Sequence, residues 1–176
     1  MRKRPDAAGW APLGPETSIP GTTWTGTLQS PFVDFLLDMR HPRAFVNLEE
    51  SLLRAGRRTV AFSQITTAQL MTGSRNIHDL SLLLVLASDS GLRAPVLLRE
   101  RAGHILDRAD RANVLRVLGE SSVAFPASST DPSGRFARTN FPRNVDKQTA
   151  IALVTDPPHF GDALPTEDQL EWGSTR

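Results

Sequence analysis

Short apolar runs that alternate with helix-like stretches constrain the fold of this chain more than any other feature. Runs with the length of buried strands lie at residues 33–37, 60–65, 95–98 and 150–155. Apolar residues recur at helical spacing in the stretches 43–55, 76–90 and 99–118. Strands that alternate with helices are typical of a parallel sheet covered by helices. The sequence therefore predicts an α/β fold with three layers and a mainly parallel sheet.

The predicted strands and helices occupy one central domain, residues 32–165. Residues 1–31 are rich in proline and glycine and show no sustained period, so we predict an extended N-terminal arm. Trp10 and Trp24, isolated aromatic residues in this arm, are expected to pin it onto the domain, and the alternative is that they form a stacking surface. Residues 166–176 are polar and are predicted to form a loosely held tail.

The composition excludes several kinds of chemistry. The chain has no cysteine, which removes disulfides, thiolate metal sites and cysteine nucleophiles. Its formal net charge is +1, so any basic binding surface must be local. The longest apolar run, Leu80–Ala87, is far shorter than the roughly 20 residues that span a bilayer. We expect a cytoplasmic protein without membrane contact.

Polar residues follow several of the apolar runs at their carboxyl ends, where open α/β sheets bind ligands. Asp38 ends one such run, and Asp156 follows the last one. Gln69 stands within Ile65–Gly73, which reads Ile-Thr-Thr-Ala-Gln-Leu-Met-Thr-Gly. This stretch is similar to the Thr-x-x-Glu-Leu-x-x-Gly turn and helix of the PIN-domain nucleases. Over residues 32–165 the order of the elements also resembles that family.

The resemblance implies a metal-dependent ribonuclease. In such a site carboxylates hold Mg²⁺ or Mn²⁺, and the metal activates water for attack on a phosphodiester. It implies that Asp38, Gln69 and Asp156 form the catalytic group and that Asp38 and Asp156 are the metal ligands. Gln69 is a neutral amide where the family has an acid, and Pro157 takes the place of the expected fourth acid. We therefore predict a weakened or inactive PIN-like ribonuclease whose partner is nucleic acid.

Two alternatives to the nuclease stay open. Asp156-Pro157-Pro158-His159 is similar to the Asp-Pro-Pro-Tyr loop of amino-directed DNA methyltransferases, which holds the target amino group of a flipped base. The chain contains no glycine-rich loop for S-adenosylmethionine, so it would be a fragment of such an enzyme. The other alternative is a non-catalytic interaction module whose arm and long loop bind a protein partner.

The long loop is residues 121–144, which are rich in serine, proline, threonine and arginine. Basic and aromatic side chains are interleaved in it, as in proteins that bind single strands. We assign Arg135, Phe136, Arg138 and Arg143 as candidate nucleic-acid-binding residues. The alternative is an ordinary solvated loop.

The first prediction concerns activity. The isolated protein is expected to cleave RNA weakly or not at all, even with Mn²⁺, because Gln69 leaves the predicted site one negative charge short. Incubation of a single-stranded RNA with the protein and Mn²⁺, followed by gel analysis, measures this. Rapid cleavage that depends on the metal would contradict the prediction.

Overall fold

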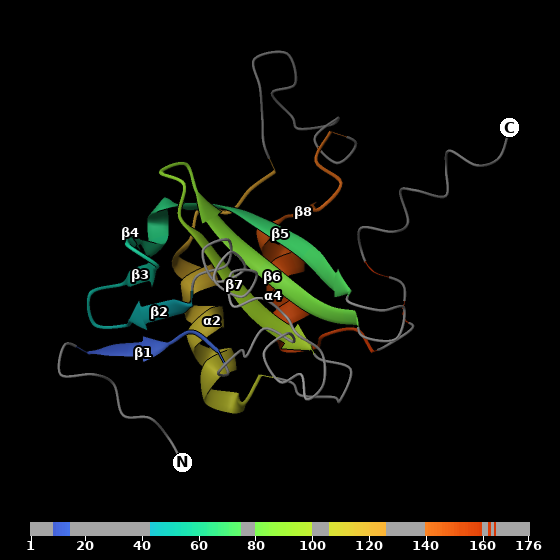
Figure 1. Ribbon diagram of the computed structural model, residues 1–176, viewed down its shortest axis with the longest axis horizontal. Coiled ribbons are helices and arrows are strands. Elements are labelled where there is room, and N and C mark those ends of the chain that lie inside the picture. The colour runs from blue at the N-terminus through green and yellow to red at the C-terminus, as the bar shows by residue number, and fades with distance from the viewer. Residues whose placement is uncertain are drawn as a thin grey trace, which may run out of the picture.

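The computed structural model describes residues 9–14, 43–74, 80–99, 106–125, 140–159, 162 and 164, which form two antiparallel sheets and two α-helices (Figure 1). Sheet A has the strand order β1-β2-β3-β4, with bounds Trp10–Pro12, Ala44–Asn47, Leu52–Ala55 and Arg58–Ala61. Sheet B has the order β7-β6-β5-β8, with bounds Arg93–Arg99, Leu80–Ser88, Ile65–Ser74 and Asn144–Val145. The helices are α2, Arg108–Glu120, and α4, Lys147–Thr155. A single turn of 3₁₀-helix, η1 (Phe62–Gln64), joins β4 to β5.

The predicted three-layer, mainly parallel α/β fold is wrong, because every described strand pair is antiparallel. The apolar run that we assigned to a buried helix at 76–90 is instead strand β6. Its Leu84 and Leu86 face the core, and Val85 between them is also buried. A central strand buried on both faces is apolar at successive positions, so periodicity alone does not distinguish it from a buried helix.

The predicted helix at 43–55 is the hairpin of β2 and β3. Alternate residues Ala44 and Val46 are buried while Phe45 is half-buried, which is the two-residue period of a strand. The Asn47 side chain accepts hydrogen bonds from the backbone N–H groups of Glu49 and Glu50, at 3.1 and 3.2 Å, and so bends the chain. Such a local side-chain bond favours a turn over a helix. The stretch after Ile65, also expected to be helical, is the long strand β5.

The predicted last strand, residues 150–155, is part of helix α4. Ala150, Leu153 and Val154 are buried at helical spacing, and the Asp146 side chain caps the helix by accepting from Thr149 N at 2.7 Å. The predicted helix at 99–118 is confirmed only from Arg108, where Asp107 caps α2. The strand predicted at 95–98 lies within β7.

Two other predictions fall at the start of the chain. Trp10, assigned to an extended arm, begins β1, which pairs with β2 in sheet A. The predicted first strand, residues 33–37, lies outside the described residues.

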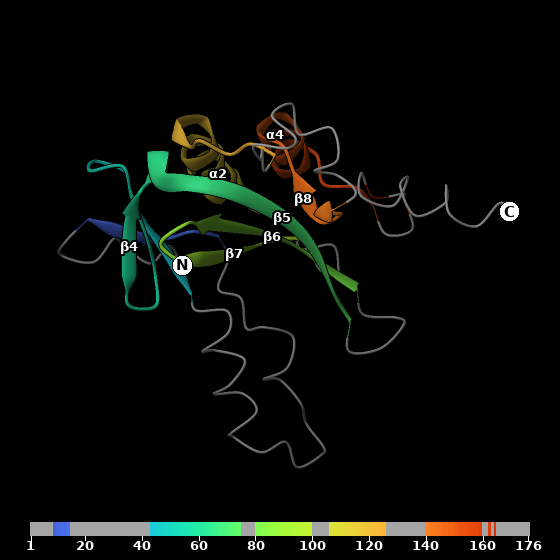
Figure 2. The same cartoon turned by 90° about the horizontal axis from the view of Figure 1, so that it is seen from above.

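One apolar core joins both sheets and both helices. Figure 2 shows α2 and α4 side by side over one face of sheet B, with sheet A beyond one end of it. The core is formed by the inward residues of the two sheets and by three residues from each helix: Ala44, Val46, Leu53, Val60, Ala68, Leu70, Leu84, Leu86, Val96, Val114, Val117, Leu118, Ala150, Leu153 and Val154. On the opposite face of sheet B, Val85 and Leu97 are buried as well.

The second prediction compares two leucines of β6. Leu86 is fully buried in the core, whereas Leu83 is half-buried on the opposite face of sheet B. Leu86→Ala is expected to lower the free energy of unfolding by about 2–5 kcal/mol, the usual cost of truncating a core leucine. Leu83→Ala should cost clearly less. Urea denaturation of both variants measures the difference, and equal losses would contradict the assignment of faces.

Candidate nucleic-acid interface

The outer face of sheet A, which is the face turned away from the core, carries aromatic and arginine side chains. The register pairs Val46 with Leu53 and Leu53 with Val60, and these three residues point inward. The alternate residues point outward, so Phe45 and Arg54 are direct cross-strand neighbours on the outer face. Side chains of paired residues on one face lie close enough to interact. This outer face comprises Trp10, Pro12, Phe45, Asn47, Leu52, Arg54, Thr59 and Ala61.

Arg54 stacks on two aromatic rings. Its Cζ atom lies 4.3 Å from the centroid of the Trp10 ring and 5.2 Å from that of Phe45. Arg43, just before β2, places its Cζ atom 5.9 Å from the Phe45 centroid. A guanidinium within about 6 Å of a ring centroid is attracted by the quadrupole of the ring. Trp10, Phe45 and Arg54 are each half-buried, so each residue keeps part of its surface in contact with solvent.

The charges of the described strands are all positive. None of the eight strands contains Asp or Glu, and their charged residues are Arg54, Arg58, Arg93 and Arg99. Arg57 adds a further exposed guanidinium in the turn between β3 and β4. The acids of the described chain lie in turns, helices and helix caps. On the outer face of sheet A the charged strand residue is Arg54, with Arg43 beside Phe45 and with the Glu50 carboxylate bonded to Asn47.

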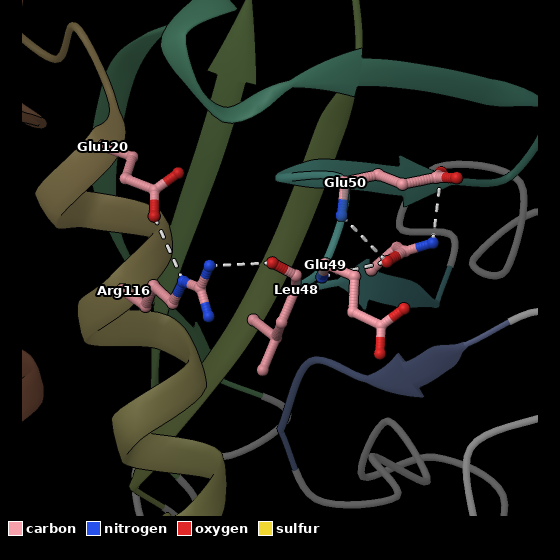
Figure 3. A network of polar contacts seen from close by, with 6 residues as sticks. Leu48, Glu49, Glu50, Arg116 and Glu120 are labelled. Atoms are coloured by element: carbon pink, nitrogen blue, oxygen red, sulfur yellow. Dashed lines mark hydrogen bonds and ion pairs between the residues drawn. The ribbon is translucent and has the colours of Figure 1, made fainter.

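Polar contacts fix sheet A against helix α2 (Figure 3). Arg116 of α2 donates from Nη2 to the backbone oxygen of Leu48 at 2.8 Å and from Nε to Glu120 at 3.1 Å. Hydrogen bonds from the side chains of Ser51 and Arg116 hold the pKa of Glu120 below its usual value. Ser51 adopts a φ of 53°, which lets the chain turn from β2 into β3. The strands that carry Phe45 and Arg54 thus have a defined position on the domain.

The residues predicted as a catalytic group are not brought together in the described structure. Gln69 lies in β5 between Ala68 and Leu70, which both face the core, so its side chain points to the other face of sheet B. Helix α4 packs on the core side, and Asp156 is the exposed residue at its C-terminal cap. Asp38, the remaining member, lies outside the described residues, and its role stays a prediction.

Gln69 does not fit the role of a metal ligand in this arrangement. Its Oε1 atom, the only coordinating atom of the side chain, accepts a hydrogen bond from Arg93 Nη2 at 3.1 Å. A cation on this oxygen would lie beside a positively charged guanidinium, which repels it. Across the described residues, no three His, Asp or Glu side chains are grouped as metal ligands.

The Asp156–His159 loop follows a helix, whereas the methyltransferase alternative places it after a strand. Asp156, the residue before Pro157, has φ −140° and ψ 85°, which lies outside the helical region. Arg99 of β7, itself buried, donates a hydrogen bond to the backbone oxygen of Pro158. The His159 N–H donates to Asp162 at 2.7 Å. These contacts hold the loop against sheet B.

Of the predicted nucleic-acid-binding residues, Arg143 is described and exposed. Its backbone oxygen accepts from Leu70 N at 2.8 Å, so the residue lies at the edge of β5. Arg135, Phe136 and Arg138 lie outside the described residues, and their role stays a prediction.

Sequence reasoning missed the stack on the outer face because it assigned Phe45 and Arg54 to a helix and Trp10 to an arm. A two-residue strand period applied to residues 44–47 and 52–55 was the reading of the sequence that could have revealed it. That pattern places Phe45 and Arg54 on one face once a turn is assumed after Asn47. The partnership with Trp10 has no signal in the sequence, since β1 and β2 are separated by a long intervening segment.

Comparison with known proteins gives no relative: no protein-family model matches the chain, and neither the curated proteins nor the solved structures provide a significant match. Within the described ranges, no helix is both long and apolar enough to cross a membrane. The function must therefore be argued from the geometry.

The third prediction tests the stack itself. Phe45→Leu and Arg54→Gln, alone and combined, should show a coupling of about 0.5–1 kcal/mol in the free energy of unfolding, the usual size of an accessible cation–π contact. The control is Arg57→Gln, an exposed arginine of the same hairpin, which should change stability by less than about 0.5 kcal/mol. Additive effects in the double variant would show that the ring and the guanidinium do not interact.

Proposed function

We propose that this protein is a non-catalytic module that binds single-stranded nucleic acid on the outer face of sheet A. The observation that carries the proposal is the stack of Arg54 between the rings of Trp10 and Phe45 on strands that contain no acid. Single-strand binders combine a basic surface along the phosphates with aromatic rings on which bases stack. This face offers both on one sheet.

Each group has a defined role in the proposed complex. The accessible parts of the Trp10 and Phe45 rings stack with bases, an interaction that tolerates any sequence because every base has a π-face. Arg43, Arg54 and Arg57 neutralise phosphates. Because Arg54 already lies against both rings, little side-chain freedom is lost when it meets a phosphate. The proposed binding is therefore salt-dependent and only weakly sequence-specific.

This proposal keeps the nucleic-acid partner and the cytoplasmic location expected from the sequence. It does not require cleavage, and the ribonuclease prediction rests on Asp38, which lies outside the described residues. An acidic protein partner is the competing occupant of a basic face. Binding of an acidic protein would require the arginines but not the aromatic rings, because such a partner has no bases to stack. This difference can be measured.

The fourth prediction uses a fluorescent oligothymidine of about 15 nucleotides, near the upper site size of a single-strand-binding domain. The wild-type protein should bind it in an anisotropy titration. Trp10→Ala should weaken binding by roughly tenfold, because one base–aromatic stack contributes about 1–3 kcal/mol. Trp10→Phe, which keeps a ring, should retain most of the affinity.

An abasic oligonucleotide of the same length distinguishes contacts to the bases from contacts to the phosphates. Arg54→Gln should weaken binding of both chains, whereas Trp10→Ala should affect only the chain with bases. Arg108→Gln serves as the matched control, because Arg108 is an exposed arginine on α2. Equal wild-type affinity for the two chains would contradict the proposal. Tighter binding of polyglutamate than of the oligonucleotide would favour the protein partner.

A further inference from the structure

A chain of three polar side chains crosses the outer face of sheet B, the face turned away from α2 and α4. Gln69 of β5 donates from Nε2 to Asn144 Oδ1 of β8 at 3.0 Å. Its Oε1 accepts from Nη2 of Arg93, at the start of β7, at 3.1 Å. Asn144 is buried, Gln69 is half-buried and Arg93 is exposed. The three hydrogen-bonded side chains thus run from the buried amide of Asn144 to the exposed guanidinium of Arg93.

The amides set the orientation of that guanidinium. Register pairing of Gln69 with Asn144 holds the two backbones together, so the Gln69 amide has one favoured orientation. Its oxygen then holds one N–H of Arg93, out of the five that a guanidinium carries. A planar guanidinium held in this way is prepared for bidentate contact with a phosphate. Neither amide carries charge, so the full positive charge of Arg93 is retained.

Exposed residues of the same kind lie next to this chain. Phe141 and Arg143 are exposed in the turn that leads into β8, and Asn144 N donates to the Phe141 backbone oxygen at 2.9 Å. Phe141 is 46% exposed, unlike the other large apolar side chains of the described residues. The turn that ends at Asn144 therefore carries an exposed ring and a second exposed guanidinium.

The two sheets are connected by arginine. Arg58, at the start of β4 in sheet A, donates to the backbone oxygen of Ser90 in the turn between β6 and β7. Arg93 follows that turn by three residues. Positive side chains thus occur on β3, on β4 and at the start of β7. Arg54 and Arg58 lie on opposite faces of sheet A, because Arg54 pairs with Thr59 and Arg58 pairs with the core residue Ala55.

We infer that Arg93 binds a phosphate of the same single strand and that Gln69, held by Asn144, is the residue that positions it. This inference rests on the proposed function and extends it to a second contact site on sheet B. Phe141 stacks with a base there, and Arg143 meets a neighbouring phosphate. Gln69 takes the place of an acid in the nuclease-like pattern. In this inference it positions an arginine and does not bind a metal ion.

The choice of glutamine over glutamate is explained by this role. A carboxylate at position 69 would pair with Arg93 and neutralise it. It would also face the acceptor Oδ1 of Asn144 without a proton to donate. Gln69→Glu should therefore reduce anion binding and should not create a site for Mn²⁺.

The test measures the affinity for the oligothymidine as a function of NaCl concentration. Arg93→Gln is expected to weaken binding threefold to tenfold and to reduce the slope of log K against log[NaCl] by about 0.7, the value for one phosphate contact on a single strand. Gln69→Glu should give the same change in slope. Gln69→Leu, which removes both hydrogen bonds but leaves Arg93 charged, should weaken binding while the slope stays near that of the wild type.

Circular dichroism and thermal melting confirm that each variant is folded, and Arg108→Gln is again the matched arginine control. Calorimetry with Mn²⁺ should show no binding by Gln69→Glu, and uptake of the metal would overturn the assigned role of Gln69. If Arg54→Gln weakens binding while Arg93→Gln changes neither affinity nor slope, the inference fails and the proposed function stands. If the wild-type protein does not bind the oligonucleotide, both fail.

Discussion

The pairing of β6 with β5 and β7 is the interaction on which the rest of the structure depends. β6 lies inside sheet B and contributes Leu82, Leu84 and Leu86 to the core on one face. Val85 is buried on the other face. β6 is a nine-residue strand without charged residues, and it is buried on both faces. Unfolding would expose a large apolar area of this strand to water, which opposes unfolding. Both helices and sheet A pack against the surface that this strand and its neighbours create.

Both sheets contribute one face to the shared core. The other face of sheet A carries the Arg54 stack, and that of sheet B carries the polar chain through Gln69. On sheet B, the outer face also includes buried Val85 and Leu97 beside these polar groups. The two proposed contact sites therefore occupy the same structural position, the non-core face of an antiparallel sheet.

The edges of the sheets are closed by different means. The N–H groups of Ser122 and Ala124 donate to backbone oxygens at the start of β5, and β8 pairs farther along the same strand. At β7 the edge contains Pro95, which lacks an N–H group and cannot extend a ladder from that position. These features disfavour the addition of a further strand. They direct binding to side chains on the sheet faces.

The sequence by itself determined the short-range features of this protein. The strand at 95–98 and the part of the 99–118 helix that begins at Arg108 were predicted from the local pattern, whereas α4 was predicted as a strand. Tertiary structure decided whether the Leu80–Ala87 run became strand or helix, since burial on both faces removes the period that separates them. It also decided the candidate site. Trp10 meets Arg54, and Gln69 meets Arg93, only because antiparallel pairing joins strands that are distant in the chain, and no local pattern encodes which strands will pair.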